Sequence, residues 1–173
     1  MKIALNAGHT ITGAGSGAVY PSFKESDMTR LVWRYISAEL KNHNVKVINC
    51  TVDKAETRTA YLKAVCDKAN ASNADLFLSI HFNASENKLG NGVEVYTWKG
   101  RQHGEAVEIC ANISHLGFKN RGVKDGSNLY VIKNTDMKAI LVEVCFLDNP
   151  TDINLFLYNG IKEIVQAISN AVL

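Results

Sequence analysis

Residues 139–147 read AILVEVCFL, a continuous apolar run that only Glu143 interrupts. A run of this length without polar alternation is typical of a strand buried on both faces, as in a parallel sheet covered by helices. An ionised carboxylate inside such a strand is costly unless it is paired, protonated or placed at an opening. Pairing with an arginine such as Arg58 or Arg121 is one explanation of Glu143, and a catalytic role is the other.

Apolar strand-like segments alternate with amphipathic helical segments along the rest of the chain. We expect strands over 2–7, 45–49, 76–82, 93–97, 129–132 and 139–146, and helices over 25–42, 57–72, 102–117 and 159–172. A glycine-rich loop is expected over 8–23, with Ser22 and Ser26 as candidate caps of the helix that follows, and a turn over 117–122. The alternation predicts the α/β class, with a twisted, mostly parallel central sheet flanked by helices on both faces.

The bulk composition predicts one domain over residues 1–173. With 173 residues, of which 46% are hydrophobic, the chain can bury one substantial core, and it contains no internal repeat or linker. A net charge of +2 without an arginine-rich or lysine-rich run argues against a nucleic-acid partner. The four cysteines form no Cys-x-x-Cys pair, so we expect them to be reduced and to pack as small apolar side chains.

Targeting and membrane segments are not expected from the sequence. The apolar stretch at the amino terminus is too short for the core of a signal peptide, and no apolar run approaches the roughly 18 residues that a bilayer span requires. We therefore expect synthesis in the cytoplasm without a signal peptide.

Two histidines follow apolar strand segments. In the stretch LFLSIHFNAS, residues 76–85, His81 stands at the exit of the run, and His9 follows the first strand after Gly8. A lone histidine beside an apolar segment is commonly a hydrogen-bonded structural residue. However, ligand sites of open α/β sheets lie beyond the carboxyl ends of the strands, so His9 and His81 are candidates for one site. They could form an acid/base pair, but a metal site is favoured because neutral imidazole is a common zinc ligand.

Glu25 is the candidate for a third ligand. A metal site with two histidines usually takes a carboxylate as well and leaves a fourth position for water. Glu25 follows the glycine-rich loop, whose glycines allow the chain to fold back towards His9. The alternative is that Glu25 is acidic only because carboxylates favour the amino termini of helices.

Several spaced motifs together resemble a known family. They are Gly8-His9, the acid Glu25 after a glycine-rich loop, RTAYLKAVCDKANASNADLFLSIHFNA at 58–84, NGVEVYT at 91–97, NRGVK at 120–124, LYVI at 129–132 and LVEVCFLDN at 141–149. In this order, and over almost the whole chain, they look like the zinc-dependent N-acetylmuramoyl-L-alanine amidases called amidase type 3, which include catalytic domains of phage endolysins.

The resemblance implies a zinc amidase catalytic domain over residues 1–173, with His9, Glu25 and His81 as ligands of Zn²⁺ and Glu143 as the catalytic acid/base. The sequence departs from the family pattern at Asn6-Ala7, where Asp-Pro is usual, and at Thr10 and Cys145, where glycine is usual. Cys145 lies two residues from Glu143 and is therefore expected on the same face of its strand, where we interpret it as a packing residue.

The implied substrate is peptidoglycan of the bacterial cell wall, cut at the amide between N-acetylmuramic acid and L-alanine during lysis or wall remodelling. A separate wall-binding domain is a possible partner of such a catalytic domain. Three alternatives stay open: a zinc peptidase that cuts within the stem peptide, a noncatalytic wall-binding module of the same fold, and a zinc hydrolase of soluble muropeptides. The polar residues Arg58, Asn83 and Asn134 are weaker candidates for positioning roles.

Overall fold

The structure is a computed structural model that describes residues 1–20 and 23–173. Its main strands are β1 (Lys2–Ala7), β5 (Lys46–Asn49), β7 (Leu76–Asn83), β8 (Val93–Thr97), β9 (Asn120–Asp125) and β10 (Lys138–Phe146). Its helices are α1 (Glu25–Asn42), α2 (Arg58–Asn70), η1 (Trp98–Gly100), α3 (Gly104–His115), α4 (Tyr130–Lys133) and α5 (Pro150–Val172). Two-residue strands complete the list: β2 (Thr12–Gly13), β3 (Val19–Tyr20), β4 (Phe23–Lys24) and β6 (Lys54–Ala55).

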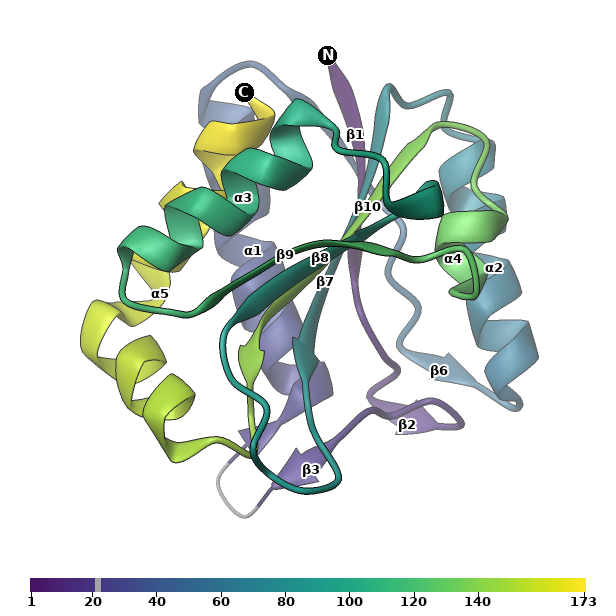
Figure 1. Cartoon of the computed structure of the whole chain (residues 1–173). Coiled ribbons are helices and arrows are strands. Elements are labelled where there is room, and N and C mark those ends of the chain that lie inside the picture. The colour runs from purple at the N-terminus through teal and green to yellow at the C-terminus, as the bar shows by residue number, and fades with distance from the viewer. Residues whose placement is uncertain (21–22) are drawn as a thin grey trace.

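The six main strands form one sheet in the order β5-β1-β7-β10-β8-β9. Strands β5, β1, β7 and β10 are parallel to one another, whereas β8 is antiparallel to β10 and β9 is parallel to β8. The expectation of a mostly parallel central sheet is confirmed. The carboxyl ends of β1, β7 and β10 meet at one edge, the lower edge in Figure 1, where the short strands also lie.

Helices cover both faces of this sheet, as expected for the α/β class. Helices α1, α3 and α5 lie on one side and α2 and α4 on the other (Figure 1). Alternate strand residues supply the two cores: Leu78 and Ile80 of β7 face α1 and α5, whereas Phe77 faces α2 and α4. Burial on both faces is the reason why these strands are continuously apolar.

Three elements differ from the sequence expectations. The expected strand over 129–132 is instead the N-cap Leu129 and the first three residues of the single-turn helix α4. A short apolar run has no period that distinguishes a strand from a helix. The expected turn over 117–122 ends in the edge strand β9, whose extra residue against β8 makes a bulge near Gly122, at φ +76°. Helix α5 begins at Pro150 rather than 159, with Asn149 capping it and a bend at Gly160.

The caps of α1 also differ from expectation. The residue at its N-cap is Lys24, without a side-chain cap, and the Ser26 hydroxyl is buried without a hydrogen-bond partner among the described residues. Ser22 lies outside the residues that the structure describes.

The cysteine expectation is confirmed. All four cysteines are free and buried: Cys50, Cys66, Cys110 and Cys145. In the described ranges, no helix has the length and apolar character that a bilayer crossing requires.

Candidate metal centre and active-site cleft

Strand β1 delivers the chain to the site beside strand β7. The Gly8 N–H donates to the Ile80 carbonyl at 2.9 Å, which continues the pairing of the two strands up to the level of His81. A Cβ atom at Gly8 would lie 2.3 Å from Cε1 of the His81 ring. Only glycine therefore leaves room for this imidazole at the strand end.

His9 is held in a strained backbone conformation by its neighbours. Its φ of +68° lies in the left-handed region, which is unfavourable for a residue with a side chain. The His9 N–H donates to the Tyr61 hydroxyl at 2.6 Å, and Arg30 Nη2 donates to the His9 carbonyl at 2.9 Å. These contacts fix the direction in which the ring leaves the backbone.

Glu25, the first residue of α1, lies between the two histidines. Its Oε1 is 2.9 Å from His9 Nε2 and 3.3 Å from His81 Nδ1. The same oxygen accepts from the Phe82 N–H at 3.1 Å, and Oε2 accepts from the Ala18 N–H at 3.0 Å. The carboxylate is thus tied to both a strand and the glycine-rich loop, which folds back as expected.

The three predicted metal ligands come together in this way. One ligand-type atom each from His9, Glu25 and His81 lies within 4.8 Å of the other two. His9 Nδ1 donates to the Gly15 carbonyl at 2.9 Å, so Nε2 is the ring nitrogen that faces Glu25 and that would bind a metal once it carries no proton. Two imidazole nitrogens and a carboxylate oxygen are a donor set that suits Zn²⁺. The residues present therefore fit this ion.

The electrostatics of the cluster suit a metal at Glu25 and His81. Burial alone would raise the pKa of Glu25, but hydrogen bonds from His81 and His9 outweigh it and hold that pKa well below 4.5. Burial lowers the pKa of His81. Burial also opposes protonation of His9, but the hydrogen bond and charge of Glu25 raise its pKa above 6.5. An ionised Glu25 and a neutral His81 are the protonation states that bind metals, whereas His9 has to lose the proton that Glu25 favours.

Glu143 opens into the same cavity. It pairs in register with His81 on the neighbouring strand, and both side chains line a cavity of about 590 Å³ together with His9. Its Oε2 is buried without a hydrogen-bond partner in the described part of the chain. Burial, and then the charges of Glu25 and Glu94, raise the pKa of Glu143 well above 4.5.

Neither of the two arginines that the sequence offered as partners of Glu143 forms an ion pair with it in the described part of the chain. Arg121 Nε donates to Glu94 Oε2 at 2.6 Å, and no ion pair of Arg58 occurs within residues 1–20 and 23–173. Structural pairing by arginine therefore does not explain the acid in β10.

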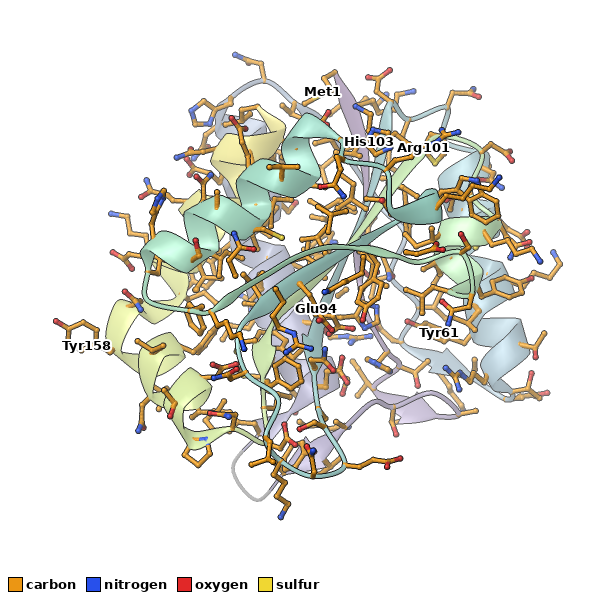
Figure 2. All side chains as sticks on the ribbon, viewed as in Figure 1. Met1, Tyr61, Glu94, Arg101, His103 and Tyr158 are labelled. Carbon is orange, nitrogen blue, oxygen red and sulfur yellow. The ribbon has the colours of Figure 1, made fainter. Side chains whose placement is uncertain are left out.

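Sequence reasoning missed a polar cluster around Glu94, which lies on strand β8 (Figure 2). Glu94 pairs in register with Glu143 of β10. Glu94 Oε1 accepts from Asn83 Nδ2 at 2.7 Å and from the Tyr96 hydroxyl at 2.9 Å, while Oε2 takes the Arg121 bond. The sequence did indicate that Glu94 and Tyr96 share one face of their strand. It did not indicate the bulge in β9 that brings Arg121 to Glu94.

Two further expectations are settled by the geometry. Asn134 donates to the Tyr130 carbonyl at the end of α4 and does not line the cavity. Cys145 packs among the residues beneath α1 and α5, on the face opposite Glu143, so the expected shared face is wrong. The cause is the register shift of β10 between Glu143 and Phe146, and the interpretation of Cys145 as a packing residue stands.

Comparison with known proteins gives a consistent assignment. The profile of the family described as N-acetylmuramoyl-L-alanine amidase matches residues 3–173. An uncharacterized protein of Clostridium perfringens is 34% identical, covering 99% of this chain and 51% of that protein. The endolysin of Bacillus phage SPP1 is 31% identical, covering 84% of this chain and 54% of the endolysin. The chain thus spans about half the length of these curated relatives.

Solved structures share the fold over its full extent. The catalytic domain of the CD27L endolysin, described as targeting Clostridia difficile, superimposes with a TM-score of 0.87 at 26% identity and covers 99% of this chain and 96% of that one. The catalytic domain of CwlV, an amidase from Bacillus (Paenibacillus) polymyxa, gives 0.82 at 27% identity, covering 99% and 95%. The chain therefore belongs to the N-acetylmuramoyl-L-alanine amidase family.

Proposed function

We propose that residues 1–173 form the catalytic domain of a zinc-dependent N-acetylmuramoyl-L-alanine amidase. It hydrolyses the amide between the lactyl group of N-acetylmuramic acid and L-alanine in bacterial peptidoglycan. The observation that carries the proposal is one cavity lined by the two histidines of the His-Glu-His cluster and by Glu143, whose Oε2 has no hydrogen-bond partner among the described residues. The likeness to two endolysins supports a role in lysis of the cell wall.

In the proposed mechanism, His9, Glu25 and His81 would hold the ion, which would act as a Lewis acid on the substrate carbonyl and make water more acidic. Glu143 accepts the proton of the attacking water and then donates it to the leaving amine of L-alanine. The raised pKa of Glu143 suits both steps, because a more basic carboxylate takes a proton more readily and still carries it when the amine leaves.

Digestion of purified cell walls tests the proposed reaction. The zinc-loaded protein should release new lactyl carboxyl groups and new amino-terminal L-alanine, which mass spectrometry of the fragments identifies. Chelation should stop the release, and added zinc should restore it. Fragments cut within the stem peptide would instead establish the peptidase alternative, and intact walls with zinc bound would establish a noncatalytic module.

Metal content gives a second, independent measurement. His81→Ala removes one of three ligands, so the variant should hold much less zinc after dialysis than the parent protein, as measured by elemental analysis. His43→Ala is the matched control, because His43 is an exposed residue at the C-cap of α1, whereas Glu25 of the cluster lies at the opposite end of this helix. Equal zinc in the two variants would contradict the assignment of His81.

A further inference from the structure

The cavity extends beyond the residues that the proposed mechanism uses. Its other wall comes from the first turns of α2 and from the segment before and within α4, with Arg58, Leu62, Asn128, Leu129 and Tyr130 facing the space. Figure 2 shows Tyr61, a neighbour on this wall, beside α2. At about 590 Å³, the cavity has the volume of a small-ligand site rather than of a single water and ion. This wall is therefore placed to contact a substrate on one side of the scissile amide.

Arg58 gives this wall a positive charge that no carboxylate of the described residues neutralises through an ion pair. Among the described residues that line the cavity, it is the one lysine or arginine. Arg30 and Arg121, two other arginines, are each held by a carboxylate, at 2.8 and 2.6 Å. Arg58 has no such ion pair within the described ranges, and the first turn of α2 contains no acid.

The charges of the substrate decide which part of it Arg58 can bind. The carboxyl of the lactyl group is consumed in the scissile amide, and an N-acetylated sugar is neutral. Negative charge near this bond therefore lies on the peptide side. When a glutamate linked through its side chain follows L-alanine, its α-carboxyl is the nearest group, and it is either a free carboxylate or an amide.

The apolar part of the wall agrees with a peptide on this side. Leu62 and Leu129 offer aliphatic surface beside Arg58, which suits the methyl group of L-alanine. A guanidinium fork binds a carboxylate through two parallel hydrogen bonds, whereas a carboxamide offers it one neutral oxygen.

We propose that Arg58 is a specificity residue that binds the α-carboxylate of the residue following L-alanine, so that the domain prefers stem peptides in which this group is not amidated. The inference rests on the proposed function and names the peptide chemistry that the same cavity selects.

Two synthetic substrates that differ in one group test the inference. Both are N-acetylmuramoyl-L-alanyl-γ-D-glutamyl-L-lysine amides, and the α-carboxyl of the glutamyl residue is free in one and amidated in the other. The zinc-loaded protein should hydrolyse the free acid with a kcat/KM about tenfold higher than that of the amide. A factor of about ten is the gain expected from one charge-assisted hydrogen bond. Arg58→Gln should reduce this ratio to about one, and Arg58→Lys should keep part of it.

The matched control is Lys63→Gln. It removes the same charge from the same helix, but Lys63 is exposed, pairs with Asp67 and does not line the cavity, so the substrate ratio should stay at its parent value. A parent ratio near one, or an equal ratio in the parent and in Arg58→Gln, would overturn the inference.

Equilibrium binding separates this inference from the proposed reaction. The Glu143→Gln variant should bind the free-acid compound about tenfold more tightly than the amide, and Arg58→Gln in the same background should abolish the difference, as measured by calorimetry. Binding discrimination without hydrolysis by the parent protein would contradict the proposed function and support the Arg58 inference. Hydrolysis of both compounds with equal binding would do the reverse.

Discussion

Two glutamates face each other across strands β8 and β10, the buried Glu94 and the partly buried Glu143, and their surroundings differ in almost every respect. Glu94 accepts three hydrogen bonds, from Asn83, Tyr96 and Arg121, and one of these donors is charged. Glu143 has an oxygen without a partner in the described structure and a pKa raised by burial. The comparison teaches that burial alone does not mark a reactive carboxyl. A reactive carboxyl is marked instead by an oxygen without a hydrogen-bond partner and by its position at a cavity.

The contrast extends to Glu25, the third acid of this region. Burial acts on both Glu25 and Glu143, but two histidines lower the pKa of Glu25, whereas the neighbouring carboxylates raise the pKa of Glu143. Environments that separate the pKa values of nearby acids assign them different roles. Under the proposed function, Glu25 stays ionised as a metal ligand, and Glu143 exchanges protons.

The largest expected effect comes from neutralising the unpartnered acid. Glu143→Gln keeps the shape of the side chain but removes its basicity, so kcat for wall hydrolysis should fall by about 10³-fold or more. Zinc content and the circular dichroism spectrum should match those of the parent, because Glu143 is not one of the three proposed ligands. A variant that retains full activity would remove Glu143 from the mechanism.

Truncating the satisfied acid should instead reduce stability. Glu94→Ala leaves the Arg121 guanidinium and the amide of Asn83 without their acceptor, so the free energy of unfolding should fall by about 2–4 kcal/mol. Urea denaturation of the zinc-free protein measures this loss. Glu94→Gln should lose less, since its amide oxygen still accepts from Asn83 and Tyr96. If Glu94→Ala were as stable as the parent, the Glu94 cluster would have no structural role.

The smallest expected effect is a gain in stability that depends on pH. The folded-state pKa of Glu143 is raised above its unfolded value of 4.5. At pH values between the unfolded-state and folded-state pKa, the folded protein therefore binds one more proton than the unfolded protein. Parent stability should therefore fall as pH rises above about 4.5, and Glu143→Gln should escape that loss.

At neutral pH, this variant should be more stable than the parent by about 1–2 kcal/mol in the presence of a chelator. The gap should close below the unfolded pKa. Urea denaturation at a series of pH values measures it, and a gap that is independent of pH would show that the Glu143 proton is not its cause.

The sequence predicts those parts of the fold whose burial produces a recognisable hydrophobic pattern in the sequence. Strands β1, β7 and β10 are buried on both faces and are therefore continuously apolar. The edge strand β9 carries the polar sequence NRGVKD and contains a bulge, so its residues read as a turn. Helix α4 is one turn long, too short for a helical period to show.

The same reasoning explains what was predictable in the site. His9 and His81 lie at or near the carboxyl ends of β1 and β7, where a polar residue after an apolar run is visible in the sequence. Glu25 is the first residue of α1 and follows a glycine-rich loop. The pairing of Arg121 with Glu94, and the turn of Cys145 to the opposite face, both depend on register shifts between strands. A local sequence pattern does not encode a register shift, so neither feature could be derived before the structure.

The supports of the His-Glu-His cluster have a consequence for assembly. Tyr61 and Arg30 hold the backbone of His9, and the N–H groups of Phe82 and Ala18 hold Glu25, so protein groups alone set the arrangement. Small zinc modules fold only around their ion. This domain, by contrast, rests on two apolar cores and can complete folding first. Under the proposed function, the supply of zinc, and not a refolding step, determines when the finished domain becomes active.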